Sequence, residues 1–335
     1  MSVPLVAVLL PVHDAIGTLP AALRSIQRQT LTDFECVVVD DGCSDGSAGI
    51  VRSFAAADAR FVLVSQPHAG VAAALERGLA RCRGRYVARM DADDLSHKRR
   101  LELQIEQLEA RPELAGIGAH VWMFPRRTLT DGLAAHERWL NSLDEPASVA
   151  RDAFVECPIV HPTLCIRREV LTAHGYRDAG WPQDYDLVLR LLASGQRLAV
   201  LPRKLLGWRD GPNRITRTAD YTRRERIVAC KAHYLARGFL AGSHRYVLWG
   251  YGDTGRTLCR ALRLHGKQPH TIVELHPRRI GQQIAGAPVV HPSALAGRAG
   301  LAVVISVSGT EQRNEARARA RTLGLVEGGD FVVAA

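Results

Sequence analysis

The chain has 335 residues, enough for a main domain of more than 200 residues and a smaller second one. With 47% hydrophobic and 23% charged residues it has the composition of a globular protein, and no apolar run reaches the roughly 18–20 residues that span a bilayer. The net charge is +10, but the basic residues have few aromatic neighbours and no DNA-reading motif accompanies them, so we expect no nucleic-acid partner.

Strands and helices alternate through the first part of the chain. Helical patterns follow Thr18, Ser44 or Asp45, Gly70 and Asp94, the first of them with Pro20 in its first turn. Strongly apolar strands separated by helices indicate a mostly parallel sheet covered on both faces. The predicted strands are Val6–Pro11, Glu35–Val39, Phe61–Ser65 and Tyr86–Met90.

The pattern weakens from about Arg126 to Pro158 and then resumes. A turn-rich segment precedes a helix that begins near Asp184, and a short strand is expected over residues 197–201. A further helix is expected from about Ala219 to Arg237. Two glycines and a serine between residues 238 and 243 indicate a linker, after which a second strand–helix–strand pattern begins. We therefore place a domain boundary near residue 240.

Basic residues crowd the stretch from Arg203 to Arg237, which includes Arg214 and Arg217. One interpretation is an acidic partner, such as a diphosphate, an anionic glycan or a membrane surface. The other is a solvated helix face, and the sequence leaves both open.

The seven cysteines form no CxxC pair and have no even spacing, which argues against a zinc site and a disulfide scaffold. The apolar run near the start is broken by Pro11 and lacks a charged leader, so it is interpreted as a strand and not as a secretion signal. A reducing cytoplasmic environment is expected, with the inner face of the membrane as a further expectation.

Acidic residues follow three of the predicted strands. Because ligands bind open α/β sheets at the carboxyl ends of the strands, Asp14, Asp40, Asp41 and the cluster from Asp91 to Asp94 should converge. Asp91 and Asp93 would point the same way on an extended backbone, an arrangement that suits Mg²⁺ or Mn²⁺ carrying a diphosphate. The alternative is that Asp93 or Asp94 caps the next helix.

Five segments in this order resemble the family-2 glycosyltransferases, which have the nucleotide-diphospho-sugar transferase fold. They are Leu10-Pro11-Val12-His13-Asp14, Val38-Val39-Asp40-Asp41-Gly42-Cys43-Ser44-Asp45-Gly46, Ala88-Arg89-Met90-Asp91-Ala92-Asp93-Asp94, Arg100-Leu101-Glu102-Leu103-Gln104 and Gln183-Asp184-Tyr185-Asp186-Leu187.

The resemblance implies a mostly parallel, mixed α/β sheet of GT-A type over residues 1–215, with a donor-binding half (1–125) and an acceptor half (126–215). It implies metal and diphosphate contacts at Asp91 and Asp93, with Mn²⁺ or Mg²⁺ as cofactor, and a general base at Asp184. A base is needed because an acceptor hydroxyl is a poor nucleophile until its proton is accepted. The donor-nucleotide residues would be Pro11, His13, Asp14, Asp40, Asp41 and Asp91.

Some positions differ from the family pattern. Gln183 stands where glutamate is frequent, Glu76 where many relatives have asparagine, and His13 where an aromatic ring often stacks on the base. On the acceptor side we expect Gln183 together with His161, in a His-Pro-Thr segment, and Trp181, which would give a sugar ring an apolar platform. A structural histidine and a core tryptophan are equally compatible with the sequence.

The last part of the chain, residues 243–335, carries a glycine-rich turn after an apolar strand. Gly250, Gly252 and Gly255 open a helix and Glu274 ends the next strand, as in a small Rossmann-like domain that binds a phosphate at the helix N-terminus. The alternative is that the glycines serve tight packing and that the domain mediates interactions, including oligomer formation. Residues 216–242 would form a helix and a linker.

The leading hypothesis is an inverting transferase that moves a sugar from a nucleotide-diphosphate donor, with a UDP-sugar favoured, to a hydroxyl of a glycan or lipid-linked acceptor. One alternative is a nucleotide-sugar binding or scaffold protein without transfer activity. A second is an NAD-linked oxidoreductase that uses the turn from Gly250 to Gly255. Contact with a membrane surface remains an expectation from the charge.

Overall fold

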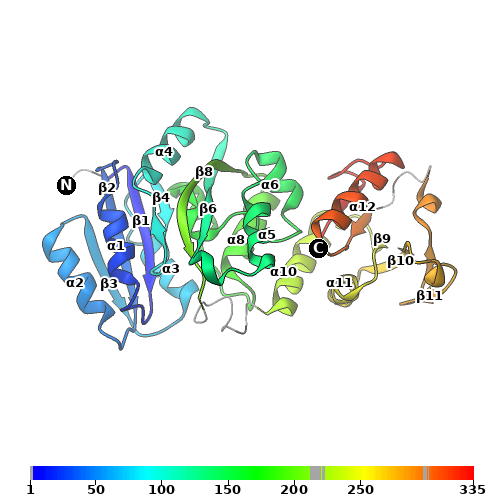
Figure 1. The fold of residues 1–335 in the computed structure, drawn as a ribbon, viewed down its shortest axis with the longest axis horizontal. Helices are drawn as coiled ribbons and strands as arrows, with labels where there is room; N and C mark the ends of the chain where they lie inside the picture. Colours follow the sequence, from blue (N-terminus) through cyan, green and yellow to red (C-terminus); the bar gives the residue numbers. More distant parts are fainter. Residues whose placement is uncertain (1–2, 212–219, 221–222, 297–299, 301) are drawn as a thin grey trace. The chain divides into compact units, whose positions relative to one another are not determined.

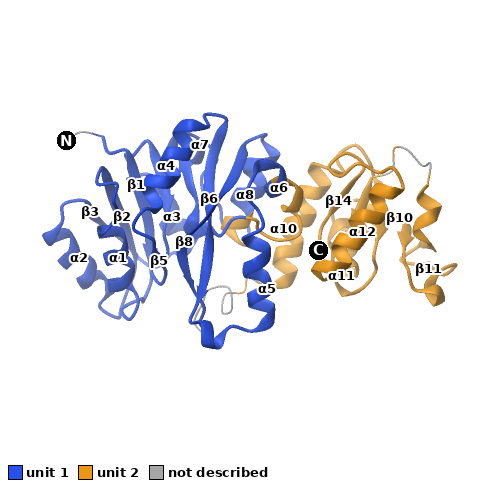
Figure 2. Ribbon diagram, turned by 45° about the horizontal axis from the view of Figure 1, so that its top comes forward, with its two compact units in different colours: residues 1–149, 159–179, 186–217 blue, residues 150–158, 180–185, 218–335 orange. Residues whose placement is uncertain are grey.

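The structure, a computed structural model, describes residues 3–211, 220, 223–296, 300 and 302–335. The chain forms two compact units, coloured separately in Figure 2. The first consists of Met1–Val149, Ile159–Ala179 and Asp186–Arg217, and the second of Ala150–Pro158, Gly180–Tyr185 and Thr218–Ala335. No helix among the described residues combines the length and hydropathy that crossing a membrane requires.

The first unit is built on an eight-stranded sheet with the order β3-β2-β1-β4-β7-β6-β8-β5 (Figure 1). The four strands from β1 to β4 are parallel, and β7 runs antiparallel to both of its neighbours. This is the mostly parallel mixed sheet that the sequence predicts. The strands are β1 (Val6–Val12), β2 (Phe34–Asp41), β3 (Phe61–Gln66), β4 (Tyr86–Arg89), β5 (Leu95–Ser96), β6 (Leu114–Phe124), β7 (Cys165–Arg167) and β8 (Arg197–Arg209).

Helices cover both faces of this sheet. Leu19, Leu23 and Ile26 lie at helical spacing on α1 and belong to the core that contains Val8 and Leu10 of β1. The opposite face packs on α3, where a Cβ on Gly78 would come within 2.3 Å of Leu9. The helices are α1 (Leu19–Gln27), α2 (Ser47–Ala57), α3 (Val71–Leu79), α4 (Arg100–Ala110), α5 (Asp131–Leu140), α6 (Pro146–Asp152), α7 (Arg168–His174) and α8 (Gln183–Ala193).

Two sequence-based expectations need correction. Helices α5 and α6 occupy the region from Arg126 to Pro158, where the sequence indicated little regular structure. The helix after the acidic cluster begins only at Arg100, with Arg99 at its N-cap, because β5 intervenes. The alternative that Asp93 or Asp94 caps that helix is therefore wrong.

The second unit contains a six-stranded sheet with the order β11-β12-β10-β9-β13-β14. Its pairs are parallel apart from β11 with β12. The strands are β9 (Arg245–Trp249), β10 (Gln268–Val273), β11 (Gln283–Ile284), β12 (Ala287–Val290), β13 (Val303–Ile305) and β14 (Phe331–Val333), and the helices are α10 (Arg224–Arg237), α11 (Asp253–Arg263) and α12 (Thr310–Thr322).

Helix α10 contributes Val228 and Leu235 to the core of this second unit, where they join Leu258 of α11 and Leu248 of β9. Residues 216–242 were assigned from sequence to a helix and a linker. They thus include a helix that belongs to the core of the second unit. The described part of the helix begins at Arg224, and Arg214, Arg217 and Ala219 lie outside the described residues.

Candidate functional site

Three adjacent parallel strands end at the same edge of the first sheet. β1 lies between β2 and β4, with Val12 paired to Asp40 and Leu9 to Arg89. The Met90 backbone N–H donates to the Leu9 carbonyl over 3.0 Å, so the chain leaves β4 toward Asp91 beside the end of β1. The topology therefore brings the ends of the strands that precede Asp14, Asp40 and Asp91 to one edge, as expected from the sequence.

Asp41 is the most tightly held carboxylate of this edge. Its Oδ1 accepts from Gln66 Nε2 (2.7 Å) and the Ala69 N–H (2.9 Å), and its Oδ2 accepts from the Gly70 N–H (3.0 Å). Burial by itself raises the pKa of Asp41, but these hydrogen bonds hold the pKa below its ordinary value. Asp41 is therefore an anion fixed to the loop that follows β3.

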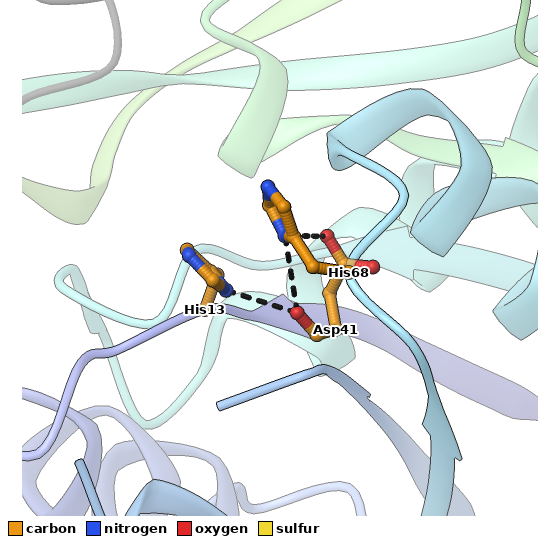
Figure 3. A group of neighbouring side chains, drawn as sticks. All are labelled: His13, Asp41 and His68. Atoms are coloured by element: carbon orange, nitrogen blue, oxygen red, sulfur yellow. Dashed lines mark hydrogen bonds and ion pairs between the residues drawn. The ribbon is translucent and has the colours of Figure 1, made fainter. Parts of the chain in front are cut away.

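Two histidines flank Asp41 (Figure 3). The Nδ1 atoms of His13 and His68 lie 2.9 and 3.2 Å from the Asp41 carbonyl oxygen, and His68 Nδ1 is also 3.0 Å from Asp41 Oδ2. The two rings are stacked with 4.0 Å between their centroids. Both imidazoles remain about half exposed, so they form a flat, accessible wall at the sheet edge.

Asp14 and Asp40 lie beside this wall, and both accept hydrogen bonds from the backbone of the loop that follows β2. Asp14 has a φ of 43°, and its carboxylate accepts from the Ser44 N–H over 2.7 Å, the main reason that its pKa lies below the ordinary value. Asp40 Oδ1 accepts from the Cys43 N–H over 2.9 Å. Pro11, the remaining nucleotide candidate on β1, is buried and paired with Val39.

The acidic cluster after β4 is held by two arginines. Arg89 forms an ion pair with Asp91 from a buried position. Arg209, at the end of β8, donates its backbone N–H to Asp94 Oδ1 (2.8 Å) and its Nε–H to the Asp93 carbonyl (2.7 Å). One oxygen each of Asp91, Asp93 and Asp94 lies within 4.8 Å of the others, and this all-oxygen set fits Mg²⁺ or Mn²⁺.

His161 is buried, with 6% of its surface exposed. Its Nε2 lies 3.1 Å from the Tyr176 hydroxyl, and burial, with the nearby Arg89 charge, holds the pKa of His161 well below its ordinary value. Glu76, the departure from the family pattern, accepts a hydrogen bond from the Tyr176 N–H. These contacts favour a structural role for His161. They also show that Glu76 holds the backbone at Tyr176.

The proposed base and its neighbours lie at the start of α8. Asp184 is in the first turn, and its Oδ1 accepts from the Tyr185 N–H over 2.8 Å. Gln183 is buried, and the Trp181 ring lies 5.2 Å from that of His233. The segment Gly180–Tyr185 belongs to the second compact unit.

Packing accounts for two glycines of the glycine-rich turn in the second unit, Gly250 and Gly255. Gly250 has a φ of +94°, and a Cβ on Gly255 would lie 2.0 Å from the Gly250 carbonyl oxygen. Glu274 accepts from the Tyr251 N–H (2.7 Å) and from Arg279 Nη1 (3.0 Å), so the turn and the acidic strand end bind each other. This arrangement favours the packing interpretation of the glycines.

Sequence reasoning missed His68, Arg89 and Arg209. His68 follows β3 at the same sheet edge as the acidic residues, and the strand-end rule could have included it. Arg89 lies inside a buried strand and Arg209 ends a strand predicted to stop at Leu201. The local sequence contains no pattern from which either contact could be predicted.

The comparisons with known proteins agree with this architecture. The family model "Glycosyl transferase family 2" matches residues 7–174, and the chain belongs to this family. EpsE of Bacillus subtilis (strain 168), assigned as a glycosyltransferase, is 30% identical over 200 residues, covering 58% of this chain and 69% of EpsE. The amylovoran biosynthesis glycosyltransferase AmsE of Erwinia amylovora is 28% identical over 235 residues, covering 69% of this chain and 86% of AmsE.

Among solved structures, residues 1–349 of S. aureus TarS in complex with UDP have a TM-score of 0.52 and 15% identity, covering 78% of this chain and 71% of that one. The complex of the same protein with UDP-GlcNAc has a TM-score of 0.53. At this identity the likeness concerns the fold, and it confirms the predicted GT-A type architecture. The protein is a glycosyltransferase of family 2.

Proposed function

We propose that this chain transfers a sugar, with inversion, from a UDP-sugar to a hydroxyl of a glycan or lipid-linked acceptor in polysaccharide biosynthesis. The observation that carries the proposal is the sheet edge where Asp40 and Asp41 end β2 and the cluster Asp91–Asp94 follows β4, with β1 between these two parallel strands. The UDP and UDP-GlcNAc complexes of the similarly folded TarS support the choice of donor, and the name of AmsE supports the choice of pathway.

Asp91 and Asp93 would hold a divalent cation, Mn²⁺ or Mg²⁺. Their oxygens suit such a hard cation, which would neutralise the charge that develops on the leaving nucleotide diphosphate. The buried Arg89 holds Asp91 through an ion pair, and Arg209 holds the turn that carries Asp93 through a hydrogen bond to the Asp93 carbonyl. These arginines keep the carboxylates in place before the donor arrives.

Asp184 would act as the general base. It would accept the acceptor hydroxyl's proton while the oxygen attacks the anomeric carbon and the bond to the diphosphate breaks. The family motif and the place of Asp184 in the first turn of α8 support this role. The wall formed by His13 and His68, with Asp14, Asp40 and Asp41, would bind the base and ribose.

The test measures nucleotide release from a panel of nucleotide sugars with Mn²⁺ and candidate acceptors. Asp184→Asn should retain UDP binding while kcat falls by roughly 10² or more, the order expected for a missing general base. Asp93→Ala should weaken metal-dependent UDP binding. Asp131→Asn, which changes an exposed carboxylate at the start of α5, is the control and should match the unmodified protein.

Turnover that is equal in Asp184→Asn, Asp93→Ala and the control would reject the assignment of these residues. Metal-dependent UDP binding without release from any donor would instead indicate a nucleotide-sugar binding protein.

A further inference from the structure

We propose a second cation site, specific for a transition metal such as Zn²⁺, formed by His13, His68 and Asp41. It uses residues different from the acidic cluster after β4. One ligand atom from each of the three residues lies within 4.8 Å of the other two. Two imidazoles and one carboxylate are a donor set that selects Zn²⁺, Co²⁺ or Ni²⁺ over Mg²⁺.

The separations between donor atoms match the edges of a coordination sphere. Ligands about 2.1 Å from a metal are about 3.0 Å apart at a right angle and about 3.4 Å apart at the tetrahedral angle. His13 Nδ1 is 2.9 Å from the Asp41 carbonyl oxygen, and His68 Nδ1 is 3.2 Å from it and 3.0 Å from Asp41 Oδ2. These three separations therefore fall close to the edges of a coordination sphere.

Both imidazoles turn the same ring nitrogen toward Asp41. A carbonyl oxygen has no proton to donate, so each imidazole must direct an Nδ1–H at the Asp41 carbonyl. Figure 3 shows both Nδ1 atoms turned toward the same residue. A bound metal would take the Nδ1 positions, and each neutral ring would then carry its proton on Nε2.

The three residues are held before any ligand arrives. Gln66, Ala69 and Gly70 fix the Asp41 carboxylate, and the stacked rings fix each other. The histidine side chains are 45% and 58% exposed, so a cation can reach them from solvent.

Occupation of this site would have a consequence for the donor. The metal would occupy the space beside His13 and Asp41 where the donor nucleotide is proposed to bind, so metal and UDP would compete. This consequence rests on the proposed donor role of His13 and Asp41. Metal binding itself does not.

The experiment titrates the full chain with Zn²⁺ by calorimetry and with Co²⁺ by visible absorption, without nucleotide. It is done in the Asp93→Ala background, so that the acidic cluster contributes little. We expect one equivalent bound, with the Co²⁺ spectrum of nitrogen ligation. His68→Asn should weaken binding at least about tenfold, the scale of losing a first ligand. His244→Asn, which removes an exposed histidine of the second unit, should not.

His13→Asn is a second ligand variant, and circular dichroism establishes that each variant is folded. Equal Zn²⁺ affinity in His68→Asn, His13→Asn and His244→Asn would overturn the site, as would no binding up to about 1 mM. In a separate titration, Zn²⁺ should raise the Kd of UDP in the unmodified chain. Zn²⁺ bound with an unchanged Kd of UDP would overturn the competition while the metal site stands.

Discussion

At the scale of single residues, Asp41 has the clearest link between charge and stability. Its side chain is 4% exposed, and hydrogen bonds from Gln66, Ala69 and Gly70 hold its pKa below the ordinary 3.8. A carboxylate whose pKa is lower in the folded state stabilises the fold above its ordinary pKa. That contribution is lost as the pH falls toward and through the lowered value.

We expect Asp41→Asn to reduce the free energy of unfolding at pH 7 by about 2 kcal/mol, the scale of hydrogen bonds to a charged acceptor. The difference from the unmodified protein should shrink near pH 3, below the ordinary pKa of 3.8, because the unfolded chain there binds a proton that the folded carboxylate binds less readily. Urea denaturation at both pH values measures this. A difference that is the same at both would contradict the electrostatic account.

The sequence predicted those residues of the candidate site that lie at the ends of strands. His13, Asp40 and Asp91 each follow an apolar run, so the topology of a parallel sheet was enough to bring them to one edge. The ion pair of Arg89 with Asp91 was not predictable, because the pattern of a buried strand gives no reason to expect a charged side chain in it. The position of Asp184 in the first turn of a helix was predictable, but its chemical role came from the family resemblance.

At the scale of elements, the regular α/β part of the fold followed from its pattern and the middle part did not. β1 and α1 have apolar residues at strand and helix spacing and lie where expected. The buried residues of α5 are Glu137 and Leu140, so few apolar positions mark a buried face of this helix. β8 runs eight residues beyond the predicted Leu201, through exposed Pro202, Arg203 and Lys204, because β6 pairs with it on both sides of this polar interruption.

The turn from β9 into α11 allows a matched test of the packing interpretation. Gly255→Ala should destabilise the protein by about 2 kcal/mol, because the new Cβ would lie 2.0 Å from the Gly250 carbonyl oxygen and overpacking costs about 1–3 kcal/mol. Gly252→Ala should have a small effect, because nothing lies within 4 Å of its Cβ and its φ is −76°.

Thermal denaturation without any nucleotide compares the two variants. If both glycines were kept only for a bound phosphate, the two substitutions would leave the stability of the free protein equally unchanged.

At the scale of the whole molecule, the second unit depends on contacts between distant parts of the sequence. Arg317 of α12 forms an ion pair with Asp152 and donates to Glu327 Oε1 over 2.8 Å, and all three side chains are buried. Lys231 of α10 donates to the Val155 carbonyl over 2.7 Å. The stretch Ala150–Pro158 is therefore held in the second unit by charged residues that follow it by more than 70 positions.

We expect Arg317→Met to cost about 3 kcal/mol of unfolding free energy, because it leaves two buried carboxylates with one fewer cation. Arg319→Met, on the same helix, removes an exposed pair with Glu315 and should cost less than about 0.5 kcal/mol. Urea denaturation of both variants gives the comparison. Equal losses would show that the long-range pair adds nothing beyond a surface contact.

The division of the chain into interleaved segments also matters during synthesis on the ribosome. Strands β1 to β4 and the helices between them can associate as soon as they emerge, since their partners are close in sequence. The stretches Ala150–Pro158 and Gly180–Tyr185 must wait for residues beyond Thr218 before their unit is complete. Because Asp184 lies in the second of these stretches, the nascent enzyme would acquire its proposed donor-binding edge first and its proposed base only near the end of translation.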